Sequence, residues 1–474
     1  MPVGKLSTVL EGRALKIRQV VRDYPITLSV SVNGLLANFA VAFTQPTVAV
    51  FALLFTGAVL VRGRHTVTRM ILAAGVRVRH HARYHRFFSR SRWRMDDMWK
   101  GLARLVAAAF LSKDRPVLIG GDDTAQKKTG AKIYGAGMVH DNRPAARKGW
   151  DLAWGLTWVV VTVLVRVPLW PGRVFAIPVG ARLYRKKKFC SKGSGHLFQT
   201  KPQLLLEMVR QLAEWLPDYT FLLHVDGGYA SGELMQSLPK NVQVVGRMRF
   251  DAALYERPPK RQGRHRGRSP ERGKRLARPK LHVAHCSGDW TVVKLANGRR
   301  HEVQSWVGLW WTVFRERPVL VVASRRAPRR KADHPGEVQF FYTTDLAMTP
   351  HEVLEAYADR WAIECLFHEV KERMGFEEPQ CRTEKAVERT APFLLWTAGI
   401  VQYGYLIQNK PGLIAWRPRW RSRQKASASA PSFSDMLAAL RRDILHGAFQ
   451  CRSGSKNELH GKLNTLIESA AFAA

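Results

Sequence analysis

The pattern of apolar and polar residues divides the chain into helical and strand-rich parts. Up to about residue 110, apolar residues recur at helical spacing, which predicts a mainly helical region over 1–110. Over 111–250, short runs rich in β-branched residues are separated by polar turns, and one helical pattern covers 201–216. This alternation is typical of an α/β domain. The runs predicted to be buried strands are 116–121, 220–225 and 242–248.

The α/β pattern is interrupted between residues 251 and 335. Residues 260–280 combine Lys and Arg with Gly and Pro and show no periodicity, which predicts a loop that cannot pack on itself. Strand-like runs follow before the α/β pattern resumes with a strand at 338–344. We therefore expect a β-rich insertion with a basic loop. Its strand-like runs cover 281–295, 302–314 and 318–323, and its tryptophans are Trp290, Trp306, Trp310 and Trp311.

The remainder is predicted to be helical. Thr349 and Glu352 can form a capping box around Pro350, so one long helix is predicted over 350–374. A second helical stretch reaches residue 406, and an amphipathic helix is expected at 434–446 after a polar linker. The predicted parts are a helical region (1–110), the first part of an α/β domain (111–250), the insertion (251–335), the second part of the domain (336–408) and a linker with a helical C-terminal region (409–474).

Composition adds a large positive charge to this picture. The 474 residues include 76 Lys and Arg against 37 Asp and Glu, a net charge of +39, and 46% are hydrophobic. That apolar fraction can build a core, which excludes a wholly disordered chain. The charge indicates a nucleic acid or an anionic membrane surface as partner. It is concentrated at 62–94, 185–188 and 260–280; the first of these segments contains Arg62, Arg64 and Arg69 and suits either a DNA-recognition surface or a solvated face.

Two apolar stretches raise the question of a membrane. No charged residue lies between Tyr24 and Val61, but Asn33, Gly34 and Pro46 divide this stretch into pieces shorter than the roughly 20 residues that a span needs. The stretch 152–165 is also short and is rich in Trp, Thr and Val, which suits a buried strand. The N-terminus has no signal-peptide pattern, and the five cysteines form no C-x-x-C pair. These features predict a cytoplasmic protein with no membrane partner.

Two of the predicted strands end in aspartates. Asp122 and Asp123 follow the run 116–121, and Asp226 follows the run 220–225. Hydrolysis or transfer of a phosphodiester can use two divalent cations about 4 Å apart. Hard cations such as Mg²⁺ bind carboxylate oxygens. The strand-end aspartates are therefore candidate metal ligands, provided that a further carboxylate joins them.

The predicted helix 350–374 supplies such a carboxylate within a narrow polar stripe. At about 100° per residue, four polar side chains project within about 60° of one another. On an arbitrary helix such a stripe is usually a set of salt bridges on a solvated face. Beside strand-end aspartates, it could instead bind a DNA backbone and complete a metal site. The stripe consists of Tyr357, Arg360, Glu364 and Lys371.

These segments resemble the catalytic segments of bacterial DDE insertion-sequence transposases of the IS-four type. The resemblance covers roughly residues 117–406 and implies a ribonuclease-H-like catalytic domain of the α/β class. It is carried by GGDDTAQKKTG at 120–130, HVDGGYA at 224–230 and the signature Tyr357-(2)-Arg360-(3)-Glu364-(6)-Lys371 within YADRWAIECLFHEVK.

The resemblance also implies roles for individual residues. It makes Asp123, Asp226 and Glu364 the catalytic ligands of two Mg²⁺ ions, for which Mn²⁺ can substitute. Asp123 is favoured over Asp122 because the family's aspartate directly precedes a small hydroxyl residue, here Thr124; Asp122 remains the alternative first ligand. The residues implied to contact DNA phosphates are Tyr357, Arg360 and Lys371, and Lys127 and Lys128 either assist them or belong to a solvated loop.

By this resemblance, the chain is expected to be a transposase that excises and inserts its insertion sequence by phosphodiester hydrolysis and strand transfer. The basic N-terminal region would bind terminal inverted repeats in double-stranded DNA, and synapsis would require a homodimer. In relatives that cut through a hairpin, an aromatic residue of the insertion stacks on a flipped base, a role open to any of its four tryptophans. The alternative is a transposase-derived DNA-binding protein without transposition activity. The expected location is the bacterial cytoplasm, in association with the nucleoid.

Overall fold

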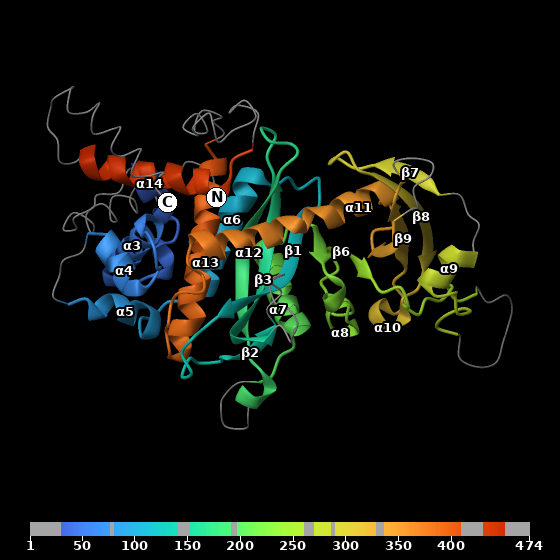
Figure 1. Ribbon diagram of the computed structural model, residues 1–474, viewed down its shortest axis with the longest axis horizontal. Coiled ribbons are helices and arrows are strands. Elements are labelled where there is room, and N and C mark those ends of the chain that lie inside the picture. The colour runs from blue at the N-terminus through green and yellow to red at the C-terminus, as the bar shows by residue number, and fades with distance from the viewer. Residues whose placement is uncertain are drawn as a thin grey trace.

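The structure is a computed structural model that describes residues 30–75, 80–140, 152–190, 197–259, 270–285, 290–328, 336–408 and 430–450. Within these residues, a mixed sheet of ten strands runs through the middle of the molecule (Figure 1). The strand order is β2-β3-β1-β5-β6-β10-β9-β8-β7, and β4 also pairs with β3. Helices gather at one end of the molecule and the last strands, β7 to β9, lie at the other.

Five strands form the sheet of a ribonuclease-H-like domain, which confirms the predicted fold class. β1 (Val117–Lys127), β3 (Leu152–Arg166) and β4 (Val174–Tyr184) are antiparallel neighbours. β5 (Phe221–Val225) and β6 (Val242–Met248) continue the sheet on the other side of β1 and run parallel to it. Parallel neighbours need a crossover connection, and the connection from β1 to β5 passes through β2, β3, β4 and helix α7 (Lys201–Trp215). A short strand, β2 (Gly137–His140), pairs with the start of β3.

The β-rich insertion extends this sheet. β10 (Gln339–Thr343) pairs with β6, and β9 (Val319–Arg326), β8 (Arg300–Gly308) and β7 (Thr291–Lys294) follow in order. Two predicted strand runs contain helices instead, α9 (Pro279–His285) and α10 (Trp311–Phe314). In α9, His282 stacks on Trp306 of β8 with ring centroids 4.2 Å apart, a tertiary contact that the local pattern does not reveal.

The predicted basic loop 260–280 is only partly described, since residues 260–269 lie outside the described part of the chain. Its second half packs on the insertion, contrary to the prediction. The amide of Glu256 donates to the carbonyl of Lys274, and the amide of Leu276 donates to that of Leu254, both at 2.9 Å. The pairing partner is thus a segment about twenty residues earlier in the chain, which a reading of the loop alone could not identify.

The N-terminal and C-terminal helices share one hydrophobic core, and the described part of the N-terminal region is helical as predicted. Phe39 and Phe51, from the long uncharged stretch, contact Trp396 with ring centroids 4.7 and 5.6 Å apart. No helix in the described part of the chain combines the length and apolar character needed to cross a membrane. The helices are α2 (Val30–Ala37), α3 (Gln45–Leu60), α4 (Val67–Ala73), α5 (Ala82–Ser89), α6 (Met95–Phe110), α13 (Glu384–Leu406) and α14 (Phe433–Gln450).

The long helix predicted over 350–374 is divided into α11 (Pro350–Asp359) and α12 (Trp361–Arg373), which follow one another across the sheet (Figure 1). The predicted capping box at Thr349 is present. The division lies at Arg360, whose amide donates to the carbonyl of Tyr357 at 3.2 Å, a tighter turn of the 3₁₀ type. Beside it, Arg166 of β3 donates to both carboxylate oxygens of Asp359, at 2.7 and 2.6 Å. This ion pair fixes the end of α11 to the sheet.

Candidate active site

A cleft of about 1050 Å³ lies between α7 and α12, along the part of β1 that extends beyond β5. It brings together residues that are far apart in the sequence. All three predicted catalytic carboxylates line it, with two of the three residues implied to contact phosphate. These cleft residues are Asp122, Asp123, Asp226, Arg360, Glu364 and Lys371.

The neighbouring residues Asp122 and Asp123 project from opposite faces of β1, as successive residues of a strand do. The glycines that precede them show which helix covers each face. A Cβ on Gly120, on the face of Asp122, would lie 2.3 Å from a side-chain atom of α12. A Cβ on Gly121, on the face of Asp123, would lie 2.6 Å from a side-chain atom of α7. Asp122 therefore faces α12, which carries Glu364, and Asp123 faces α7.

Asp226 shares the face of Asp122. In the parallel pair of β1 and β5, Gly121 is the partner of Val225, so Asp122 and Asp226 occupy the next pair of positions. Partner residues of parallel strands point to the same side of the sheet. The Tyr357 hydroxyl of α11 donates to Asp226 Oδ1 at 3.3 Å. Asp226 is thus oriented toward the helices that carry the predicted signature.

Arg360 connects the strand carboxylates to the helix carboxylate. Its Nη1 donates to Asp122 Oδ2 at 2.5 Å, and its Nη2 donates to Glu364 Oε1 at 3.1 Å. The Arg360 side chain is only 12% exposed, and it lies over the ring of Tyr357 at 5.6 Å. One guanidinium therefore holds Asp122 and Glu364 on its two sides. Asp122 is 17% exposed and Glu364 is 42% exposed, so solvent screens the contact with Glu364 more.

The Asp122 carboxylate has a strongly perturbed acidity. Burial raises the pKa of this group to about 6 from 3.8, against the opposing effects of Arg360 and of the Asp123 amide, which donates to Asp122 Oδ1 at 2.8 Å. A buried carboxyl group with a strongly raised pKa in a cleft is typical of a functional site.

Asp122→Asn is expected to stabilise the metal-free protein at pH 7.5 by on the order of 2–3 kcal/mol, because one pKa unit corresponds to about 1.4 kcal/mol. The pKa of Asp122 is higher in the folded protein than in the unfolded chain, so ionisation opposes folding. This penalty is complete above about pH 6 and disappears as the pH falls toward 3.8. Urea unfolding at several pH values should show the advantage of the variant shrinking between pH 7 and pH 4; an advantage independent of pH would contradict the assignment.

Asp123 has a different set of partners. Lys201 Nζ donates to its Oδ2 at 2.6 Å, and the Tyr229 hydroxyl donates to its Oδ1 at 3.0 Å. Neither Lys201 nor Tyr229 was predicted from the sequence to have a role at the site. One signal was available, since Lys201 is the first residue of a helix with a capping box at Thr200. A cation in the first turn opposes the helix dipole, so a compensating carboxylate could have been sought.

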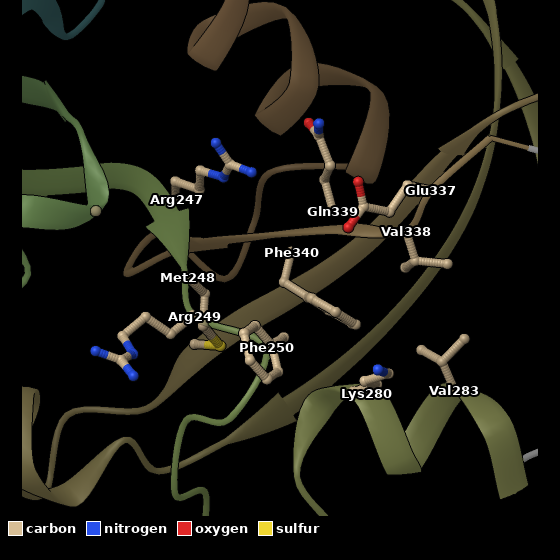
Figure 2. Close-up of a pocket in the computed structure, with 11 residues that line it drawn as sticks. Arg247, Met248, Arg249, Phe250, Lys280, Val283, Glu337, Val338, Gln339 and Phe340 are labelled. Atoms are coloured by element: carbon tan, nitrogen blue, oxygen red, sulfur yellow. The ribbon is translucent and has the colours of Figure 1, made fainter. Parts of the chain in front are cut away.

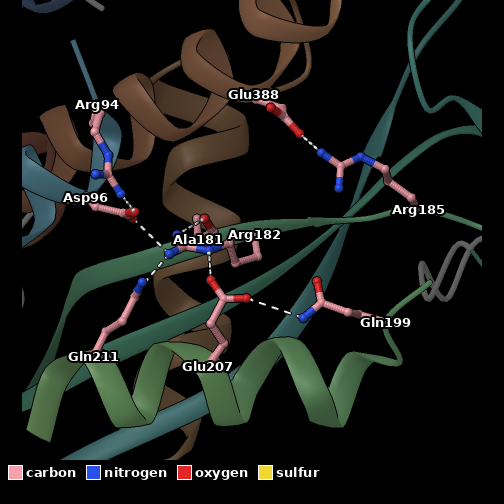
Figure 3. A network of polar contacts seen from close by, with 9 residues as sticks. All are labelled: Arg94, Asp96, Ala181, Arg182, Arg185, Gln199, Glu207, Gln211 and Glu388. Atoms are coloured by element: carbon pink, nitrogen blue, oxygen red, sulfur yellow. Dashed lines mark hydrogen bonds and ion pairs between the residues drawn. The ribbon is translucent and has the colours of Figure 1, made fainter. Parts of the chain in front are cut away.

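A polar network fixes α7 against the sheet and against α6 (Figure 3). Arg182 of β4 is at its centre, with a side chain that is 18% exposed. Its guanidinium donates to Glu207 Oε1 at 2.8 Å and to Gln211 Oε1 at 2.7 Å, both on α7. It also donates to Asp96 Oδ1 of α6 at 2.8 Å. The helix that begins at Lys201 is therefore held in place along its length.

The structure corrects one predicted DNA contact and places the others. Lys128 is buried, and its ammonium donates to the carbonyls of Glu377 at 3.1 Å and Pro379 at 2.7 Å, so it is not available to DNA. This role depends on a distant loop, which the sequence pattern does not show. Lys127 is partly buried and is not among the residues that line the cleft. The predicted DNA contacts Arg62, Arg64 and Arg69 are exposed on the helical region and do not line the cleft.

The tryptophans of the insertion mostly serve its packing. Trp310 and Trp311 are buried in the core. Trp306 stacks on His282, and Trp290 lies under Arg325 with 4.0 Å between the guanidinium carbon and the ring centroid. A more accessible aromatic side chain is Trp361, directly after Arg360, which is 65% exposed. Trp361 lies outside the insertion and was not among the tryptophans predicted as candidates for stacking on a base.

A second hollow, of about 500 Å³, is lined by residues 247–250 at the end of β6 and residues 337–340 at the start of β10 (Figure 2). Gly227 forms part of its wall. Phe250 at its rim is 58% exposed and carries Lys280 Nζ 5.9 Å from its ring centroid. The hollow thus combines an aromatic surface with positive charge. Its basic residues are Arg247, Arg249 and Lys280.

The donor set of the cleft fits hard divalent cations by its chemistry, since five carboxylates line it. Two basic side chains bind three of these carboxylates. Within the described residues, no three His, Cys, Asp or Glu side chains lie close enough together to hold a metal ion. Arg360 and Lys201 donate hydrogen bonds to carboxylate oxygens that would otherwise be available to a metal ion. Metal binding would therefore require these cations to give way.

Comparison with known proteins agrees with this site. No curated protein matches the chain. Residues 38–308 match the family described as DDE superfamily endonuclease. The matched range covers more than half of the chain and includes Asp122, Asp123 and Asp226, while α12 lies beyond it. The chain therefore belongs to the DDE superfamily of endonucleases.

Proposed function

We propose that the protein is a DNA transposase of the IS-four type, which excises and inserts its own insertion sequence. The observation that carries this proposal is the cleft itself. In a member of an endonuclease family, it gathers two strand-end aspartates, a helix glutamate, and the Arg360 and Lys371 side chains that suit a DNA backbone. Such a combination serves cleavage and transfer of phosphodiesters.

Asp122, Asp226 and Glu364 are the proposed ligands of two Mg²⁺ ions, with Mn²⁺ as a substitute. We place Asp122 in this set instead of Asp123 because it shares the face of Asp226 and the guanidinium of Arg360 with Glu364. When bound, such ions activate the attacking oxygen and stabilise the leaving oxygen of a phosphodiester.

The remaining side chains of the cleft bind and orient the substrate. Arg360 can present its planar guanidinium to a phosphate in the manner of a bidentate clamp, and Lys371 adds a point charge. Tyr357 holds Asp226 through its hydroxyl. Water would attack the phosphorus at the transposon end and break the P–O3′ bond. The 3′-hydroxyl released would then attack the target strand, with a second phosphodiester forming as another breaks.

Other surfaces suit the rest of the DNA. The exposed residues Arg62, Arg64 and Arg69 are proposed to contact the terminal inverted repeats of double-stranded DNA. Phe250 and the basic residues around it are proposed to contact a strand that passes Asp226, because the next residue, Gly227, lines the same hollow. Joining two transposon ends requires a homodimer in the synaptic complex. The proposed place of action is the bacterial nucleoid in the cytoplasm.

Cleavage of DNA that carries the terminal repeats flanking the protein's own gene tests the proposal. We expect Mg²⁺ or Mn²⁺ to release the ends from a supercoiled plasmid, and EDTA to prevent it. Asp226→Ala and Glu364→Ala should bind the same DNA in a gel-shift assay without cutting it. A wild-type protein that binds the repeats but cuts with neither metal would instead support the alternative, a transposase-derived DNA-binding protein.

A further inference from the structure

The contacts of Asp123 are those of a residue that positions its neighbours. Both of its carboxylate oxygens already accept a hydrogen bond, one from Lys201 and one from Tyr229. Tyr229 is only 4% exposed, so its hydroxyl has little freedom to leave. Asp123 also faces α7, on the side of β1 away from Glu364. Asp122 also has both oxygens in hydrogen bonds, so the face of β1 is what separates the two residues: Asp123, on the face away from Glu364, is poorly placed to share a metal ion with it.

The partner Tyr229 belongs to the turn that carries Asp226. This turn, η3 (Gly227–Tyr229), is a single 3₁₀ turn in which the Tyr229 amide donates to the Asp226 carbonyl at 3.0 Å. Its first two residues are glycines, which restrict the backbone least. A catalytic side chain needs to be held within about 0.5 Å of its working position. The turn therefore depends on Tyr229 for its rigidity.

We propose that Asp123, Lys201 and Tyr229 form a positioning unit that fixes the turn bearing Asp226. This inference rests on the proposed function, in which Asp226 is a metal ligand. Lys201 compensates the charge of Asp123 and orients its carboxylate, and Asp123 fixes the Tyr229 hydroxyl. The Arg182 network contacts α7, the helix that begins at Lys201, through Glu207 and Gln211 (Figure 3). The contacts from Lys201 to Asp123 and from Asp123 to Tyr229 thus connect α7 to the turn that carries Asp226.

Replacing each aspartate by Asn separates positioning from metal binding. Asn at position 123 keeps an oxygen for the Tyr229 hydroxyl, so we expect Asp123→Asn to bind Mn²⁺ within about threefold of the wild-type Kd and to retain cleavage within about tenfold. Asp122→Asn should weaken Mn²⁺ binding at least about tenfold, since it would remove a ligand charge. Mn²⁺ binding is measured by electron paramagnetic resonance on the full chain without DNA.

A double-mutant cycle tests whether Asp123 and Tyr229 act as one unit. Tyr229→Phe and Asp123→Ala should each lower cleavage about tenfold, and the double variant should be no worse than either, because each removes the same contact. Tyr219→Phe is the matched control: it removes a hydroxyl just before the opposite end of β5 and should change cleavage less than about twofold. Additive losses in the double variant would overturn the proposal.

Failure of this inference differs from failure of the proposed function. If Asp123→Asn weakens Mn²⁺ binding as much as Asp122→Asn, Asp123 is a ligand and the positioning unit is disproved. A wild-type protein that binds Mn²⁺ without cutting DNA would disprove the proposed function alone, and the Mn²⁺ affinities of the two Asn variants would still decide the role of Asp123.

Discussion

Asp122→Asn is expected to reduce metal-dependent DNA cleavage by about 10³-fold. The variant keeps the size of the side chain and removes its charge. A metal ion contributes several kcal/mol of charge stabilisation in the transition state, and each 1.36 kcal/mol corresponds to a tenfold change in rate. Asp122 is the β1 carboxylate on the face of Asp226, and it shares Arg360 with Glu364, so its loss removes a ligand charge from the centre of the proposed site.

Single-turnover cleavage at saturating Mg²⁺ measures this effect, with DNA affinity measured in Ca²⁺ to show that binding persists. The loss of activity should accompany the gain in stability described above, a combination that unfolding of the variant cannot produce. Cleavage within about tenfold of wild type in Asp122→Asn, together with an inactive Asp123→Asn, would reverse the assignment of the two aspartates.

Arg360→Gln is expected to destabilise the metal-free protein by on the order of 3 kcal/mol, the scale found when one partner of a buried ion pair is removed. The Arg360 guanidinium is 12% exposed and binds Asp122 and Glu364, so the variant leaves two carboxylates uncompensated in one cleft. Loss of Arg360 also removes an interaction that lowers the pKa of Asp122, so that pKa should rise above its present value of about 6.

Urea unfolding in the absence of metal tests this prediction. The deficit should decrease as the pH falls and Asp122 takes up a proton, and it should also decrease in Mn²⁺. Arg360→Lys is the control for charge, since it keeps the cation but loses the fork that reaches both carboxylates, and an intermediate stability is expected. A stability of Arg360→Gln equal to that of wild type at pH 7.5 would show that the guanidinium does not compensate these carboxylates.

Much of the secondary structure followed from local features of the chain. Predicted strands at 116–121, 220–225 and 242–248 correspond to β1, β5 and β6 because short β-branched runs between turns suit buried strands. The capping box at Thr349 formed as predicted because its partners lie three residues apart. The predictions that differ from the structure concern segments with distant partners, as in α9, the residues after 270, and the division at Arg360.

For the candidate site, too, some features followed from the local sequence and others from distant contacts. Strand ends and helical spacing are local properties, so the sequence was enough to identify the acids at two strand ends and on one helix. Tertiary contacts were needed to show that Asp122, and not Asp123, faces Glu364, that Lys201 pairs with Asp123, and that Lys128 is buried. Successive residues of a strand always point to opposite faces, but the helix that covers each face is set by packing across the whole domain.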